Sequence, residues 1–177
     1  MRPRLLIACT AAALLASVAA PGCAPSEGCD PGQPCACSDL GGDCFLGCAG
    51  DGCSQDCHNV GGRCGTVCNN GCSSSCHDAP DCSQSCGDGC NLDCHNVMSC
   101  ESICGDGCTY SCEDVPRCAV RAGAGSTIRC TSAAECDVEC TGDCRVTCSD
   151  VPACNVTCLG GAGPMSCSGE TFACGAC

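Results

Sequence analysis

Cysteines at regular spacing are the residues most able to do chemistry in this chain. The stretch CGDGC occurs twice, at residues 86–90 and 104–108, and the two copies are eighteen residues apart. The thiolates could bind a metal, the central aspartate could bind calcium, or the two cysteines of each copy could be bonded and close a tight turn. These three interpretations differ in the spacing and the redox environment that they need.

The composition favours the bonded interpretation. Of 177 residues, 32 are Cys and 24 are Gly, whereas Phe45, Tyr110 and Phe172 are the aromatic residues. Large side chains therefore cannot fill an ordinary core, and cross-links must replace much of the packing. Such a cysteine share is typical of disulfide scaffolds, which persist in oxidising compartments. We therefore expect a secreted or cell-surface protein.

The first twenty residues have the anatomy of a signal peptide. Arg2 and Arg4 precede an apolar run over residues 5–20 that ends in small residues, as an export signal does. The sequence Ala20-Pro21-Gly22-Cys23 loosely resembles a bacterial lipobox, which makes Cys23 a candidate lipidation site. In a bacterium the protein would then be a periplasmic or outer-membrane lipoprotein, and a lipid on Cys23 would be its membrane contact.

The charge limits the kinds of partner. The net charge is −13 and the chain contains five Arg after the two in the leader and no Lys. An acidic surface repels phosphate backbones and anionic headgroups, so nucleic acid is excluded as a partner, while cations are not. The sequence does not identify a surface or extracellular partner.

An eighteen-residue repeat organises the rest of the chain. The pattern of a full copy is four cysteines at places 1, 5, 9 and 13, followed by a five-residue connector; consecutive copies begin at Cys64, Cys82, Cys100, Cys118 and Cys136. A longer copy begins at Cys44 and an irregular one at Cys154. The connectors contain Asn or Asp followed by Val or Ala, which predicts an Asx-type turn around an inward apolar residue.

The two segments of each copy are predicted to be short strands. CDVEC, CRVTC and CNVTC alternate Cys and Val with polar residues at period two, which is typical of strands with one buried face. Cysteines four places apart on an extended strand are about 13 Å apart. That exceeds the Cα separation of about 4.4 to 6.8 Å that a disulfide needs, so each bond must join different segments.

If the two segments of a copy face each other in antiparallel orientation, nested disulfides are expected. Place 5 then lies opposite place 9, and place 1 lies opposite place 13. The copy from Cys118 has Ala122 and Ser126 at places 5 and 9 but keeps cysteine at places 1 and 13, as expected if places 5 and 9 are bonded to each other. The predicted pairs are Cys86–Cys90, Cys104–Cys108, Cys140–Cys144, Cys82–Cys94, Cys100–Cys112, Cys118–Cys130 and Cys136–Cys148.

Repeats of fixed length that can bury little apolar surface on their own tend to stack on one another. We therefore predict a small all-β, disulfide-rich fold: a flattened β-solenoid of eighteen-residue coils, with a string of disulfide-stapled β-hairpins as the alternative. The expected organisation is a signal peptide at residues 1–20, a linker and irregular cap at 21–43, and a repeat domain at 44–177.

Histidine provides a candidate metal site. His58, His77 and His95 all follow the fourth cysteine of their copies, so a solenoid would align them in a column spaced by about 4.8 Å. With Asp78 and Glu113 nearby, neutral imidazoles could bind Zn²⁺ or Cu²⁺. The plainer interpretation is that duplication copied a surface residue.

Two further metal hypotheses have less support. The CxxxC spacing suits thiolate zinc sites mainly on helices, which these segments do not form. Asp51, Asp88, Asp106 and Asp143 place one carboxylate in each turn, whereas calcium takes six to eight oxygens. We expect no cofactor beyond weak Ca²⁺ or Zn²⁺ binding.

No unique catalytic constellation stands out, because Ser, His and Asp recur at repeated positions, and we expect no enzyme activity. The sequence favours an exported repeat protein with a structural or adhesive role at the cell surface. The alternative is an extracytoplasmic metal-binding protein that uses the His column or thiolates.

Overall fold

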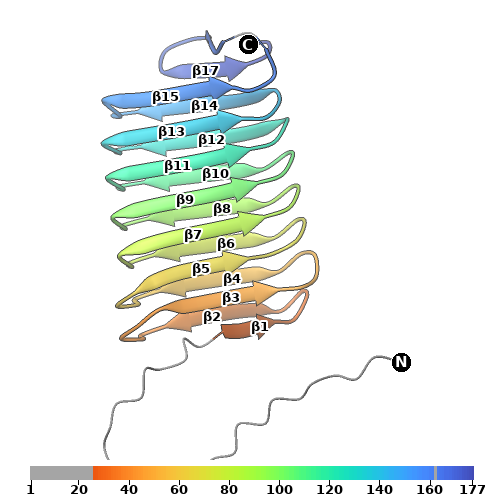
Figure 1. Ribbon diagram of the computed structural model, residues 1–177, viewed down its shortest axis with the longest axis vertical. Helices are drawn as coiled ribbons and strands as arrows, with labels where there is room; N and C mark the ends of the chain where they lie inside the picture. Colours follow the sequence, from red (N-terminus) through yellow and green to blue (C-terminus); the bar gives the residue numbers. More distant parts are fainter. Residues whose placement is uncertain (1–25, 162) are drawn as a thin grey trace, which may run out of the picture.

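The computed structural model describes residues 26–161 and 163–177, and within them the chain winds as a β-solenoid of two parallel sheets (Figure 1). The expected signal peptide at residues 1–20 and the lipidation candidate Cys23 lie outside these residues. No helix among the described residues is long and apolar enough to cross a membrane.

The strands alternate between the two sheets along the chain. The first sheet contains β1 (Ser26–Cys29), β3 (Cys44–Cys48), β5 (Arg63–Val67), β7 (Asp81–Cys86), β9 (Ser99–Cys104), β11 (Arg117–Ala122), β13 (Glu135–Cys140) and β15 (Ala153–Cys158). The second contains β2 (Pro34–Ser38), β4 (Ser54–His58), β6 (Ser73–His77), β8 (Asn91–His95), β10 (Thr109–Glu113), β12 (Ser126–Thr131) and β14 (Cys144–Ser149), and it is extended at one edge by β17 (Thr171–Cys174) and β16 (Met165–Ser166).

Each strand pairs with the strand of the next coil in parallel and in register. Cys118 lies beside Cys100 and Cys136, and Val120 lies beside Val138. Residues at one repeat place therefore form a row along the solenoid. This arrangement confirms the predicted solenoid and differs from stapled hairpins, in which the strands of one copy would pair with each other. The antiparallel pairing of β17 with β14 ends the second sheet.

Both turns of the coil have the backbone that their residues favour. In the CGDGC turns, Gly89 and Gly107 have φ of +66° and +67°, a region that glycine enters without steric cost. In the connectors, Asn96 and Asp114 both have φ of +54°, which Asn and Asp tolerate better than most residues. The next residue, such as Val115, is buried, as the Asx-turn prediction requires.

Alternating cysteine and apolar rows form the interior. Val120, Ile128, Val138 and Val146 are all buried, as the period-two alternation of these strands predicts. Tyr110 belongs to the same core and is only 2% exposed. Inward side chains from both sheets fill the space between them.

The N-terminal coils instead bury polar side chains, among them Gln55, Thr66, Ser74 and Gln84. Thr66 Oγ1 and Ser74 Oγ are 2.7 Å apart. Gln84 Nε2 donates to the carbonyl oxygens of Ser74 and Asp93, both within 3.2 Å. These inward groups are hydrogen-bonded, so burying them does not carry the full desolvation penalty.

The disulfides are found at the two edges of the coils. We call the edge that holds the turns between places 5 and 9 the turn edge, and the edge that holds the five-residue connectors the connector edge. At the turn edge the structure joins Cys86 to Cys90, Cys104 to Cys108 and Cys140 to Cys144, the three short bridges expected from the sequence. The same edge also has the bridges Cys29–Cys35 and Cys48–Cys53.

The four longer predicted bridges are wrong. The structure does not pair Cys82–Cys94, Cys100–Cys112, Cys118–Cys130 or Cys136–Cys148; place 13 is instead bonded to place 1 of the following copy. The bridges at this connector edge are Cys76–Cys82, Cys94–Cys100, Cys112–Cys118, Cys130–Cys136 and Cys148–Cys154, preceded by Cys37–Cys44 and Cys57–Cys64. The prediction treated each copy as flat, whereas the chain climbs as it winds and brings place 13 beside the next coil.

The solenoid also begins earlier than expected. Residues 26–43, predicted as part of an irregular cap, contain β1 and β2, which pair in register with β3 and β4. At the other end Cys158 is bonded to Cys174, and Cys167 to Cys177. These two bridges hold the irregular last segment against the final coil.

Candidate functional site

The predicted histidine column is present at the ends of β4, β6 and β8. His58 pairs in register with His77, and His77 with His95. The ring centroids are 5.0 Å and 4.6 Å apart, and the rings are within 8° of parallel. The three side chains are 25%, 22% and 34% exposed. Glu113 takes the same place in the next coil, beside His95.

Carboxylates surround the column. His77 Nδ1 is 2.9 Å from Asp78 Oδ2 and His95 Nδ1 is 2.7 Å from Asp93 Oδ2. The hydrogen bond with His77 lowers the pKa of the Asp78 carboxyl, and the charges of the three histidines act in the same direction. Each of these imidazoles therefore has a fixed orientation, with one ring nitrogen occupied by a carboxylate.

Asp56 lies between two of the imidazoles. Its Oδ2 is 3.2 Å from His58 Nδ1 and its Oδ1 is 3.5 Å from His77 Nε2. Asp56 Oδ1 and His58 Nδ1 are nevertheless buried and have no hydrogen-bond partner. The cluster therefore has unpartnered polar atoms at its centre, unlike the pair formed by His95 and Asp93.

The separations within this cluster suit a transition metal. Two ligands that are each 2.0–2.1 Å from a tetrahedral metal are about 3.3 Å from each other. Each of the two imidazoles lies at about this distance from one Asp56 oxygen, His58 from Oδ2 and His77 from Oδ1. His58, His77 and Asp56 offer two imidazoles and one carboxylate, a donor set that suits zinc and copper. Sequence reasoning found the histidines but missed Asp56 and Asp93. Both stand two places before a histidine, and period-two alternation would have placed them on the same face.

Three of the four turn aspartates, Asp51, Asp88 and Asp106, accept a hydrogen bond from the backbone of the next coil. Asp88 Oδ1 accepts a hydrogen bond from the backbone N–H of Asp106 at 2.8 Å, and Asp106 Oδ1 accepts one from Ala124 at 2.7 Å. Asn70 and Asp51 make the equivalent bonds one and two coils earlier. We call these bonds the turn ladder. The carboxylates connect neighbouring coils, and one oxygen of each is already occupied.

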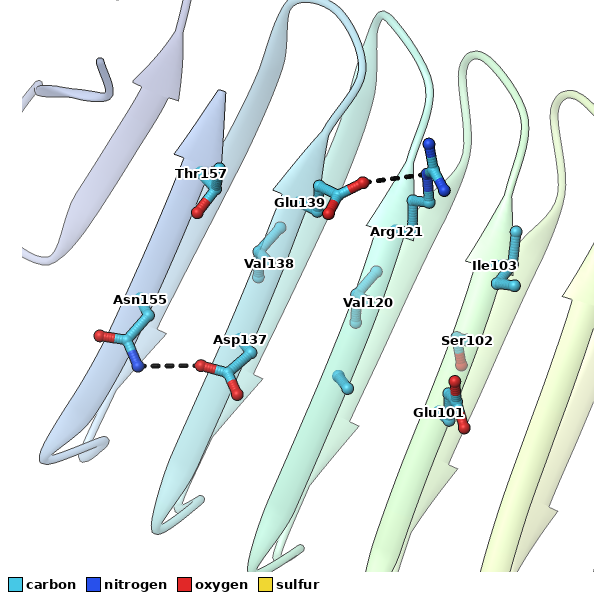
Figure 2. Close-up of a pocket in the computed structure, with 11 residues that line it drawn as sticks. Glu101, Ser102, Ile103, Val120, Arg121, Asp137, Val138, Glu139, Asn155 and Thr157 are labelled. Atoms are coloured by element: carbon cyan, nitrogen blue, oxygen red, sulfur yellow. Dashed lines mark hydrogen bonds and ion pairs between the residues drawn. The ribbon is translucent and has the colours of Figure 1, made fainter. Parts of the chain in front are cut away.

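A shallow hollow of about 430 Å³ lies on the outward face of the first sheet, over β9, β11, β13 and β15 (Figure 2). Two outward rows border it. Arg121 Nε is 3.0 Å from Glu139 Oε1 in one row, and Asn155 Nδ2 donates to Asp137 Oδ1 at 2.8 Å in the other. Figure 2 shows these pairs bridging neighbouring strands. The hollow thus lies between two side-chain rows that carry charged and polar groups.

No protein-family model matches the chain, and neither a curated protein nor a solved structure matches it. Its architecture and its side-chain geometry are therefore the basis for assigning a function.

Proposed function

We propose that the protein is an exported scaffold with a structural or adhesive role at the cell surface. The observation that carries this proposal is the bridging of the coils at both edges, from Cys29–Cys35 to Cys148–Cys154. Such extensive disulfide bonding is consistent with an oxidising, extracellular environment. The bridges stiffen a thin rod whose side chains alone could not form a large core.

The flat outward faces support the adhesive part of this role. On the first sheet, rows of side chains repeat at the strand spacing of about 4.8 Å, and the hollow beside Arg121 and Asp137 is open to solvent. Regular rows on a rigid rod can make many weak contacts with a surface at once. Because the rod is stiff, those contacts are formed with little further loss of conformational freedom.

The test is localisation in the organism that encodes the chain. A small epitope tag placed after Cys177 would be probed on intact cells with an antibody, together with a thiol count on the recovered protein. We expect staining without permeabilisation, few free thiols, and weaker cell attachment in a deletion strain. A protein recovered from the cytosol with reduced cysteines would overturn the proposal.

A second function, transition-metal binding, is favoured by the unpartnered atoms at Asp56 and His58. We propose Zn²⁺ or Cu²⁺ binding by Asp56, His58 and His77, with water completing the coordination. Zinc titration of the full chain by calorimetry would test this function. Asp56→Asn and His77→Ala should weaken binding at least tenfold, whereas His95→Ala, the matched control, should have a small effect. Equal zinc affinity in all three variants would remove the hypothesis.

A further inference from the structure

One coil lacks its turn-edge bridge although it has both cysteines. Cys68 and Cys72 occupy places 5 and 9 of the copy that begins at Cys64, and they are the free cysteines among residues 26–161 and 163–177. Both are buried. The equivalent cysteines of the next coil, Cys86 and Cys90, are bonded to each other. A dithiol therefore lies directly beside a disulfide.

The sulfur atoms of these two coils are close enough to react. Cys68 Sγ is 3.0 Å from Cys86 Sγ, and the Sγ atoms of Cys68, Cys72, Cys86 and Cys90 all lie within 4.8 Å of one another. Reacting atoms about 3 to 3.5 Å apart are at the separation of a near-attack conformation. No backbone movement is needed to bring the thiol to the disulfide.

We propose that Cys68, Cys86 and Cys90 form a thiol–disulfide exchange site beside Cys72, in which Cys68 can replace Cys90 as the partner of Cys86. The Cys68 thiol loses its proton to solvent, and the thiolate attacks Cys86 Sγ. The Cys68–Cys86 bond forms as the Cys86–Cys90 bond breaks, and Cys90 leaves as a thiolate that takes up a proton. The number of disulfides is unchanged, so the step needs no oxidant or reductant.

The surroundings favour the product as well as the reactant. The carbonyl oxygen of Asn69 is 3.3 Å from Cys90 Sγ and 3.5 Å from Cys72 Sγ. It can accept a hydrogen bond from the thiol that Cys90 becomes, so the leaving group does not remain as an unpartnered buried donor. The new bond would join two neighbouring coils at the ends of β5 and β7, whereas Cys86–Cys90 closes the turn of a single coil.

Burial controls how fast this site reacts. It raises the pKa of the Cys68 thiol well above its ordinary value, and the neighbouring Cys72 thiol acts in the same direction. Since the thiolate is the nucleophile, little of the reactive form exists at neutral pH. The exchange rate should rise roughly tenfold for each pH unit below that pKa. Burial also hinders external disulfides, so the adjacent bond is the accessible partner.

Single serine substitutions isolate the step, because each leaves one free thiol at the site. In Cys72→Ser, that thiol can move from Cys68 to Cys90. In Cys68→Ser, the attacking sulfur is absent and the thiol should stay on Cys72. The fold should tolerate both changes, since Ala122 and Ser126 occupy the same two places in another coil, which still forms β11 and β12.

The experiment maps the free thiol after incubation of the full chain at neutral and at mildly alkaline pH. Samples are quenched with acid, unfolded, labelled with N-ethylmaleimide and digested for mass spectrometry. For Cys72→Ser we expect label on both Cys68 and Cys90, with the Cys90 label appearing faster at higher pH. For Cys68→Ser we expect label on Cys72 alone.

Three results would overturn the proposal. Label confined to Cys68 in Cys72→Ser, even after long alkaline incubation, would show that the thiol does not attack its neighbour. Label spread to Cys104 and Cys108 would indicate general reshuffling rather than a local site. The wild-type chain adds a third test, since complete absence of label would mean that Cys68 and Cys72 are bonded to each other and that Cys68 has no thiol with which to attack Cys86.

Discussion

Cys112 is bonded to Cys118 across the connector, and their Cα atoms are 6.6 Å apart. The bond joins the end of one coil to the start of the next, so it fixes the rise of the solenoid as well as the thickness of the coil. A loop this short contributes about 2 kcal/mol in the chain-entropy model, which assigns the effect to the unfolded state. The same bond recurs at each connector, and the coils are held to one another along the rod.

The tryptic peptide CAVR, residues 118–121, contains Cys118 as its single cysteine. It can therefore distinguish the Cys112–Cys118 bond from the Cys118–Cys130 bond that the sequence predicted. After the free thiols are blocked and the chain is unfolded and digested, this peptide should be attached to the fragment 64–117 through Cys112. Attachment to the fragment 130–145 would instead indicate a Cys118–Cys130 bond. Mass spectrometry before and after reduction separates the two outcomes.

Removal of one rung of the turn ladder should weaken the contact between coils. In Asp88→Ala the backbone N–H of Asp106 loses its acceptor, and we expect a loss of about 1 kcal/mol in the free energy of unfolding. Asp88→Asn is the matched control, because Asn70 already accepts the N–H of Asp88 in the preceding coil. Denaturant titration with the disulfides intact should place the Asn variant near wild type. An Ala variant as stable as the Asn variant would contradict this role.

Tyr110 is the single tyrosine of the chain and therefore a spectroscopic probe of the core. Burial raises the pKa of its hydroxyl well above the ordinary value, which is about 10. The unfolded chain loses this proton more readily than the folded chain, so stability should fall as the pH rises above about 10. After a rapid jump to alkaline pH, phenolate absorbance should appear only as the protein unfolds. Immediate ionisation near pH 10 would show that Tyr110 is accessible to solvent.

The coil without turn-edge cysteines offers a place to add a bridge. The double substitution Ala122→Cys and Ser126→Cys restores places 5 and 9, and we expect the pair to bond as Cys104 and Cys108 do. The gain of about 2 kcal/mol is offset by loss of the hydrogen bond from Cys108 N–H to Ser126 Oγ, about 1 kcal/mol. The oxidised variant should therefore melt a few degrees above wild type.

Ser126→Ala is the control for that bridge, since it removes the hydrogen bond and adds no sulfur. It should lower stability by about 1 kcal/mol. A double variant that fails to oxidise, or that melts no higher than Ser126→Ala, would show that this turn cannot adopt the geometry of its neighbours.

The repeat period was enough to predict the architecture and the histidine column. Equal copies stack in register, so residues eighteen positions apart, such as His77 and His95, must become neighbours once the strands pair in parallel. The short bridges could also be predicted from the sequence, because Ala122 and Ser126 together replace the cysteines at places 5 and 9 of one copy. The first coil was missed because Cys29 and Cys35 do not keep the repeat spacing.

Only the tertiary structure decided which partner each connector-edge cysteine takes. The Sγ atoms of Cys64, Cys76 and Cys82 all lie within 4.8 Å of one another, so Cys76 is close both to place 1 of its own copy and to place 1 of the next. The sequence determined which side chains face inward, since strand alternation is a local property. The rise of the chain from coil to coil depends on packing between copies, and that rise selects Cys82 as the partner, brings Asp56 between two imidazoles and leaves Cys68 beside Cys86.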